Sequence, residues 1–180
     1  MKIEILELFG FVSAVRALRL PFRGKAKSDS IFGETYCYVD EFITSHASVK
    51  IGEKDFKLFQ SLVKNGDEHA KVVRGIIISC SITAPRYWWQ EMDTYRVGTE
   101  RLSSESTMHI EAKGLSGEEL QKMKSELKEG HEQERIQEFS YQTLRRIYFQ
   151  RKSHRLPEWH QFCEWIESLP LAKELITILK

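Results

Sequence analysis

The segment Gly75–Ala84, with the sequence GIIISCSITA, constrains the fold more than any other part of the chain. It is rich in β-branched residues, and its second half alternates apolar with polar positions, a pattern typical of a strand. Pro85 then pre-sets the first turn of a helix over Arg86–Arg96, which Gly98 closes. This strand stands among several helical patterns, so the order of elements indicates an α+β protein with a few strands among many helices.

Other elements follow from the same signals of spacing, capping and turn residues. Further strands are predicted at Lys2–Phe9 and Thr35–Phe42. Further helices are predicted at Phe11–Leu20, Glu53–Asn65, Ser116–Lys128 and Gln133–His154, and at the starts Glu68, Pro157 and Pro170. Two stretches are predicted as loops, a flexible basic one at Arg23–Ser30 and a Ser-, Thr- and Arg-rich one after Gly98. The apolar stripe predicted to be core is Trp159, Phe162, Cys163 and Ile166.

The composition indicates one soluble domain over residues 1–180, with 41% hydrophobic and 29% charged residues. Lys and Arg total 27 against 26 for Asp and Glu, so no global field draws the chain to nucleic acid or an anionic membrane. No apolar run reaches the roughly 18 residues of a spanning helix, and the N-terminus lacks the order of a signal peptide. Cys37, Cys80 and Cys163 lie outside any C-x-x-C, which favours a reducing, cytoplasmic compartment. The six histidines show no metal-ligand spacing, so no metal site is predicted.

The segment Pro85–His109 carries most of the chemical information. It places Arg, Trp, Tyr, Asp and Glu on one predicted helix, and such polar groups are costly to bury unless they are paired. The residues after Gly98 offer hydroxyls, backbone N–H groups and Arg101, which together suit a phosphate group. The segment therefore predicts an anion site.

Within this segment, the tripeptide Thr94–Arg96 is followed by seven residues and then Ser104. The spacing resembles the signature of the flavin-dependent thymidylate synthases (ThyX), in which R-H-R is followed by seven residues and a Ser. The last Arg, a hydroxyl at Thr99 and the closing Ser match in register. The first Arg and the His of the signature are replaced by Thr and Tyr, and its Asn-Glu pair becomes Arg101-Leu102.

Three further similarities to the family occur in the same order along the chain. Arg86 with the paired tryptophans Trp88 and Trp89 resembles a feature just before R-H-R, and Glu68-His69 resembles a Glu-His pair before a strand. Arg151 and His154 resemble a C-terminal Arg and His of the family. The matches span roughly residues 65 to 165 of the 180.

The resemblance implies a reaction in which a methylene group passes from methylenetetrahydrofolate to dUMP or a related nucleotide, with FAD carrying a hydride from NADPH. It implies a homotetramer with sites between subunits. Arg151 is then the catalytic cation beside the pyrimidine carbonyl. The residues implied to face the flavin are His69, Trp89, Arg96 and His154. Those implied to bind the nucleotide are Arg86, Arg101 and Ser104.

Other interpretations of these residues stay open. The altered tripeptide also fits a family relative that binds nucleotide without flavin chemistry. Arg96 alone also fits a helix-end cation paired with Asp93, and the paired tryptophans also fit a core. A basic face, which is either solvated or a nucleic-acid contact, consists of Arg145, Arg146, Arg151, Lys152 and Arg155. The near-neutral total charge and the lack of a recognised nucleic-acid motif count against the last of these.

Overall fold

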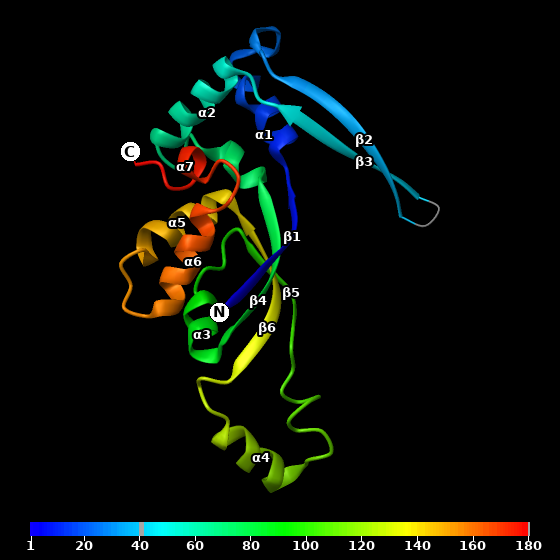
Figure 1. Ribbon diagram of the computed structural model, residues 1–180, viewed down its shortest axis with the longest axis vertical. Coiled ribbons are helices and arrows are strands. Elements are labelled where there is room, and N and C mark those ends of the chain that lie inside the picture. The colour runs from blue at the N-terminus through cyan, green and yellow to red at the C-terminus, as the bar shows by residue number, and fades with distance from the viewer. Residues whose placement is uncertain (40–41, 180) are drawn as a thin grey trace.

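A computed structural model describes residues 1–39 and 42–179 of the chain, and side chains outside residues 34–47. Its centre is a four-stranded antiparallel sheet in the order β1-β4-β6-β5 (Figure 1). These strands are β1 (Lys2–Phe9), β4 (Ile77–Pro85), β5 (Thr99–Ser104) and β6 (Glu132–Ser140). The α+β class predicted from the sequence is confirmed, as are the strands over Lys2–Phe9 and within Gly75–Ala84.

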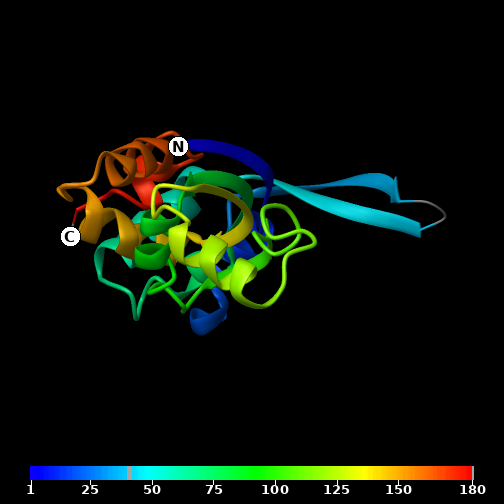
Figure 2. The ribbon, with the colours of Figure 1, turned by 90° about the horizontal axis from the view of Figure 1, so that it is seen from below.

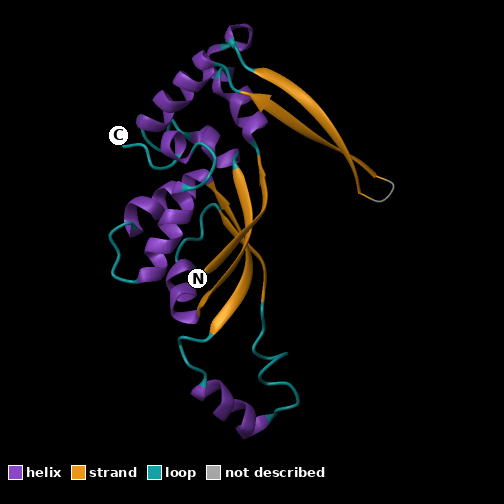
Figure 3. Cartoon of the chain, in the orientation of Figure 1, coloured by secondary structure: helices purple, strands orange, loops and turns teal. Residues whose placement is uncertain are grey.

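Helices cover one face of the sheet (Figures 1 and 3). They are α3 (Arg86–Met92), α5 (Tyr141–Arg151) and α6 (Pro157–Glu167). Alternate residues of β4 point at them, and Ile78, Cys80, Ile82 and Ala84 are fully buried. The stripe predicted on α6 is also buried, and the ring of Trp88 lies 5.0 Å from that of Trp159 and 5.4 Å from that of Phe162. Burial of such large apolar groups, at about 2–3 kcal/mol each, is the main source of the stability of this layer.

A second group of helices packs against one end of the sheet. It consists of α1 (Phe11–Leu18), α2 (Glu53–Lys64), α7 (Ala172–Leu175) and a 3-10 helix at Lys71–Gly75. The strands β2 (Ile31–Val39) and β3 (Phe42–Lys50) form a hairpin that projects from this end, away from the body (Figure 2). At the opposite end, the segment between β5 and β6 extends outward and carries α4 (Gly117–Glu126) (Figure 1).

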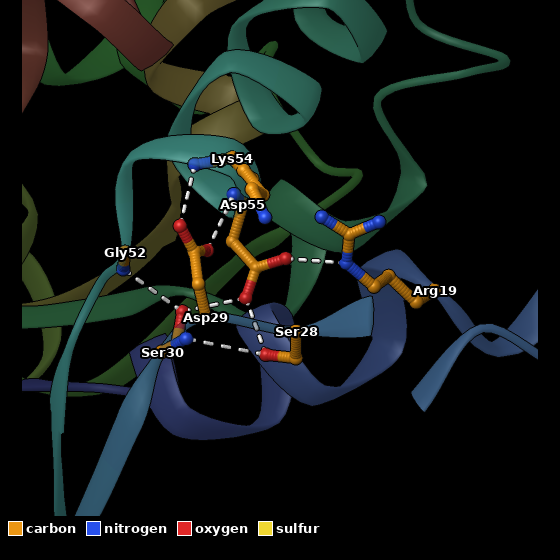
Figure 4. Close-up of polar contacts among 7 residues, drawn as sticks. All are labelled: Arg19, Ser28, Asp29, Ser30, Gly52, Lys54 and Asp55. Atoms are coloured by element: carbon orange, nitrogen blue, oxygen red, sulfur yellow. Dashed lines mark hydrogen bonds and ion pairs between the residues drawn. The ribbon is translucent and has the colours of Figure 1, made fainter. Parts of the chain in front are cut away.

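The basic stretch Arg23–Ser30 is held more firmly than its composition predicts. Short 3-10 helices occupy Leu20–Phe22 and Lys25–Lys27. The hydroxyl groups of Ser28 and Ser30 donate to the carboxylate of Asp55 on α2, and the Ser30 contact measures 2.6 Å (Figure 4). Asp29 accepts the backbone N–H groups of residues 54 and 55. This stretch therefore anchors the start of the hairpin to α2.

The prediction of one helix over Gln133–His154 was wrong in its first half, which forms β6. Two polar residues, Arg135 and Gln137, take positions on the buried face of that strand, opposite Ile82 and Cys80 of β4. A strand is recognised by alternating apolar and polar residues, and here polar residues stand where apolar ones are expected. The segment is also rich in Glu, Gln and Arg, which are good helix formers. The helical prediction was correct from Tyr141 to Arg151, where α5 ends, three residues before the predicted end.

Three smaller predictions also need correction. The residues after Gly98, predicted as a loop, form β5 because they pair with β6 from Thr99 to Ser104. The short helix predicted from Glu68 is a turn, in which the N–H of His69 bonds to the carbonyl of Gly66. The strand predicted at 35–42 is split between β2 and β3, and its residues 40–41 lie outside the described part of the chain.

Candidate functional site

The connection between α3 and β5 is fixed against the N-terminus of α5. The N–H of Ser140 donates to the carbonyl of Gly98 at 2.8 Å, and the hydroxyl of Thr143 donates to the carbonyl of Val97 at 2.7 Å. Gly98 has a φ of +78°, and a Cβ added there would lie 2.3 Å from the Thr143 hydroxyl. The close approach and the positive φ together require glycine. These contacts therefore fix the backbone next to Arg96.

Arg96 borders three adjoining hollows. Hollow A, of about 630 Å³, lies between Arg74, Arg96 and Arg146 at the start of α5. Hollow B, of about 410 Å³, lies between Asp93, Arg96 and Arg101. Hollow C, of about 380 Å³, lies between Arg96, Arg146 and Arg151. These volumes lie in or close to the range of about 300–1,000 Å³ typical of small-molecule sites.

A larger hollow, of about 760 Å³, lies elsewhere, at the base of the hairpin. Its lining is mainly apolar and includes Phe9, Phe11, Val49 and Phe56, and it contains no ionisable side chain among the residues described. Cationic and hydroxyl side chains, which suit a charged ligand, are instead gathered around Arg96. The three hollows around that residue are therefore the candidate site.

Arg151 is held on several sides within this site. Its Nε donates to the Tyr95 hydroxyl at 2.7 Å, and its Nη1 donates to Oε2 of Glu91 at 2.6 Å. The guanidinium carbon lies 4.5 Å from the centroid of the Trp159 ring. Stacking and two hydrogen bonds fix the plane of the guanidinium group. The group is therefore oriented before any ligand binds.

Glu91 also joins His154 to this group. Its Oε2 accepts from the Trp159 indole at 2.9 Å and lies 3.5 Å from Nε2 of His154. One carboxylate oxygen thus faces Arg151, Trp159 and His154 together. Glu91 is the centre of the contacts that hold this side of the site.

A second carboxylate, Asp93, stands at hollow B. It accepts from Arg135 at 2.8 Å and lies 3.9 Å from Arg101. The Arg135 guanidinium is buried against the ring of Trp89, 4.3 Å from its centroid. Burial lowers the pKa of Arg135, Asp93 opposes that shift, and the guanidinium stays charged. Asp93 therefore offsets part of the positive charge of Arg135 and Arg101 at hollow B.

The structure brings together three of the residues that the resemblance singled out. Arg96, Arg101 and Arg151 come from the α3–β5 connection, from β5 and from α5, and all three border the hollows. His154 does not line the hollows but lies 3.5 Å from Glu91, which also binds Arg151. His69 is exposed in a turn whose Asp67 borders hollow A.

The other three residues lie apart from the hollows. Ser104 is exposed at the last position of β5, and Arg86 is half-buried at the first position of α3. Trp89 is fully buried, and its indole N–H donates to the carbonyl of Gln133 at 2.9 Å. The ring of Trp89 faces the core and Arg135, so it offers no surface for a bound flavin.

Sequence reasoning missed two contributors to the site. Arg74 lies in the 3-10 helix before β4, and its Nε donates to Oε1 of Gln142 at 2.5 Å. Glu91 contacts Arg151 across a separation of 60 residues. Neither has a spacing signal in the sequence, because the partners come from different elements. The packing of the 3-10 helix on α5 brings Arg74 to Gln142, and the packing of α3 on α5 brings Glu91 to Arg151.

The described residues contain no group of three or more His, Cys, Asp and Glu side chains placed to hold a metal ion. Among the helices that the structure describes, none is long and apolar enough to cross a membrane.

The basic face predicted from Arg145 to Arg155 is not continuous in the structure. Arg145 is buried and donates to the carbonyls of Ile176 and Ile178, both at 2.7 Å. Arg145 therefore anchors the C-terminal segment and does not extend a surface for nucleic acid.

Solved structures share this fold at low sequence identity. A flavin-dependent thymidylate synthase ThyX from Helicobacter pylori, complexed with FAD and dUMP, superposes with a TM-score of 0.71 at 14% identity over 100% of both chains. Another Helicobacter pylori ThyX structure with FAD and dUMP gives 0.70 at 13% identity, over 98% of this chain and 97% of that one. The UMP/dUMP methylase PolB from Streptomyces cacaoi, bound with 5-Br dUMP, gives 0.68 at 14%, over 99% and 95%.

No protein-family model and no curated protein matches the chain by sequence. The chain therefore has the fold of flavin-dependent thymidylate synthases, and the resemblance inferred from the sequence is confirmed at the level of fold.

Proposed function

We propose that this protein is a flavin-dependent enzyme that reductively methylates dUMP or a related pyrimidine nucleotide, using FAD, NADPH and methylenetetrahydrofolate. The observation that carries the proposal is the convergence of Arg96, Arg101 and Arg151 on adjoining hollows, within a fold shared by proteins crystallised with dUMP. Of the three, Arg96 matches the family signature by spacing, Arg151 resembles a C-terminal Arg of the family, and Arg101 stands where the signature has Asn. The fold joins them from three separate elements.

Hollow A offers arginine donors to the phosphates of a dinucleotide cofactor, and its lining also includes three carboxylates, those of Asp67, Glu100 and Glu138. Arg74, Arg96 and Arg146 line it, and the N-terminus of α5, capped by Ser140, opens onto it. Helix N-termini and arginines are common partners of phosphate groups. These residues would hold the phosphates of FAD, which, when bound, supplies the transfer of a hydride from NADPH.

Arg151 would act on the nucleotide. Its Nη2 has no protein partner among the described residues, whereas Nε and Nη1 are bound to Tyr95 and Glu91. A pre-oriented cation beside a pyrimidine carbonyl stabilises the negative charge that develops during attack on the ring. Glu91 and Tyr95 thus orient Arg151, and they prevent it from relaxing toward solvent.

The absorbance spectrum of the purified protein, before and after addition of FAD, tests the flavin part. We expect a bound flavin spectrum, and we expect Arg96→Ala to weaken FAD binding by about 10-fold or more, the loss of a hydrogen bond to a charged group. Arg23→Ala is the control, because Arg23 is exposed in the loop after α1. Colourless protein that does not change on addition of FAD would refute this proposal.

A second candidate is a relative that binds nucleotide without flavin chemistry. The burial of Trp89 and the replacement of the family Arg and His by Thr94 and Tyr95 favour it. Calorimetry with dUMP in the absence of FAD separates the two candidates. Binding of dUMP by a protein that shows no flavin affinity would support this second function.

We also infer a homotetramer with sites between subunits. The edge strand β1 exposes Ile5, Leu6 and Phe9, each by about 45% of its surface. Exposed apolar side chains on an edge strand commonly mark an interface. Light scattering after size exclusion should give four times the 21.1 kDa chain mass, and Leu6→Glu should lower it. A monomer at micromolar concentration would contradict this inference.

A further inference from the structure

Hollow C differs from its neighbours in charge. Its lining includes Arg96, Arg146 and Arg151 together with Thr94 and Gln150. None of its lining residues within the described chain is acidic, whereas hollow A has three carboxylates and hollow B has one in their linings. Hollow C is therefore the most uniformly cationic concavity around Arg96.

The arginines of hollow C leave much of their hydrogen-bonding capacity unused. Nε of Arg146 is shielded from solvent and has no partner, and its Nη2 reaches only the carbonyl of Val97 at 3.4 Å. Arg96 has no side-chain partner in the described chain, and Arg151 keeps Nη2 unpaired. A buried N–H without an acceptor is unfavourable. Several donors of this hollow thus lack an acceptor in the protein itself.

Glu91 pairs with Arg151, whereas Arg96 and Arg146 have no carboxylate partner among the described residues, so positive charge is in excess around this hollow. Like charges gathered in a concave wall raise the local potential and concentrate anions there. Guanidinium groups differ from ammonium groups in offering paired, planar donors that match the oxygens of phosphate. The combination of excess positive charge, unused donors and planar geometry favours a compact anion with several oxygens.

We propose that hollow C is a binding site for a phosphate-class dianion, held by Arg96, Arg146 and Arg151. The family resemblance placed a nucleotide phosphate at Arg101 and Ser104, neither of which lines this hollow. The volume of about 380 Å³ accommodates a phosphomonoester with part of the group attached to it. The inference concerns the site of the proposed function, with which it shares Arg96, Arg146 and Arg151, but binding of the anion itself does not require flavin or methyl transfer.

Titration calorimetry with inorganic pyrophosphate, in a low-salt buffer free of phosphate, tests this proposal. Arg146→Gln should weaken pyrophosphate binding about 10- to 100-fold, as expected for loss of a charge-assisted hydrogen bond. Arg155→Gln is the matched control, because Arg155 is exposed on the same predicted basic face and borders none of the three hollows. It should change the affinity by less than about 2-fold, within the range of screened surface charges.

Three results would overturn the proposal. They are the absence of pyrophosphate binding at millimolar concentration, an equal loss in Arg155→Gln and Arg146→Gln, and tighter binding of the dicarboxylate glutarate. If Arg146→Gln does not fold, NMR of the wild-type arginine Nε–H groups decides instead. Pyrophosphate should shift the Nε signal of Arg146 and leave that of Arg155 unchanged. The flavin spectrum is measured separately, so failure of the proposed function is distinguishable from failure of this site.

Discussion

Two polar regions of this molecule use arginine and hydroxyl groups in opposite ways. In the Asp55 cluster, defined by Arg19, Ser28, Ser30 and Asp55, every donor points at one buried carboxylate, and Nε of Arg19 lies 2.5 Å from it (Figure 4). In hollow C, three arginines converge on a space with no carboxylate in its described lining. The first region is electrostatically complete within the chain. In the second region, Nε of Arg146 is shielded from solvent and has no acceptor among the described residues.

The pKa of Asp55 reflects this completeness. Burial acts to raise the pKa of its carboxyl, but hydrogen bonds from Ser28, Ser30 and Arg19 outweigh burial and hold the pKa below its usual value. A buried charge is tolerated when it is paired and hydrogen-bonded. The comparison teaches that a saturated polar cluster stabilises the fold, whereas an unsaturated one is available to a ligand.

The largest effect is expected from breaking the Asp55 cluster. Asp55→Ala removes the shared acceptor of Arg19, Ser28 and Ser30 and should lower the free energy of unfolding by about 3–5 kcal/mol, as for other buried ion pairs that lose one partner. Urea unfolding at pH 7 measures the loss. Lys57→Ala on the exposed side of α2 is the control, and a loss below about 1 kcal/mol in Asp55→Ala would place Asp55 among ordinary surface charges.

The same cluster predicts a pH dependence. Because the folded pKa of Asp55 is lowered, its contribution is complete above the unfolded value of about 3.9 and is lost as pH falls through the folded pKa. The difference in unfolding free energy between the wild type and Asp55→Asn should therefore be constant from pH 7 to about 5 and shrink below about pH 4. A difference that grows on acidification would contradict the lowered pKa.

The next effect is expected where the candidate site is attached to the fold. Gly98→Ala forces a Cβ to within 2.3 Å of the Thr143 hydroxyl at a φ of +78°. Strain and overpacking together should cost about 2–4 kcal/mol. Gly130→Ala is the control, because a Cβ there meets nothing within 4 Å. Equal melting temperatures for the two variants would show that the connection bearing Arg96 is not held as tightly as the structure indicates.

These effects also show how much the sequence could predict. The first strand, the strand over Gly75–Ala84, helix α2 and the α6 stripe follow local periodicity, and the structure confirms them. Strand β6 could not be recognised because Arg135 and Gln137 occupy its buried face. Arg135 is held there mainly by the ring of Trp89 and the carboxylate of Asp93, long-range contacts that no local pattern reveals.

The candidate site was also predicted only in part from the sequence. The spacing from Arg96 to Ser104 identified the segment that borders the hollows, and it also drew attention to Ser104, which lies at the far end of β5. Arg74 and Glu91 could not be predicted, because their roles depend on partners in other elements. A motif thus indicates where along the chain a site forms, whereas tertiary packing decides which side chains reach it.

An intermediate effect is expected at Glu91, whose carboxylate pairs with Arg151 at the candidate site. Glu91→Gln keeps the shape but removes the charge facing Arg151, so we expect a loss of about 1–2 kcal/mol in unfolding free energy, in line with a hydrogen bond to a charged group. Glu53→Gln, an exposed helix residue, is the control. A loss as large as that of Asp55→Ala would show that the Glu91–Arg151 pair, like the Asp55 cluster, mainly stabilises the fold.

The smallest effect is expected at Arg96, the residue shared by all three hollows. Because it has no side-chain partner in the described chain, Arg96→Ala should change the unfolding free energy by less than about 0.5 kcal/mol, as for other unpaired surface charges. Removing a cation from a site with excess positive charge can even raise stability, a common result at binding sites. Urea unfolding without added anions makes the measurement, and repeating it with pyrophosphate should stabilise the wild type more than the variant. A loss above about 2 kcal/mol without ligand would show that Arg96, like Arg19, is a structural partner within the fold.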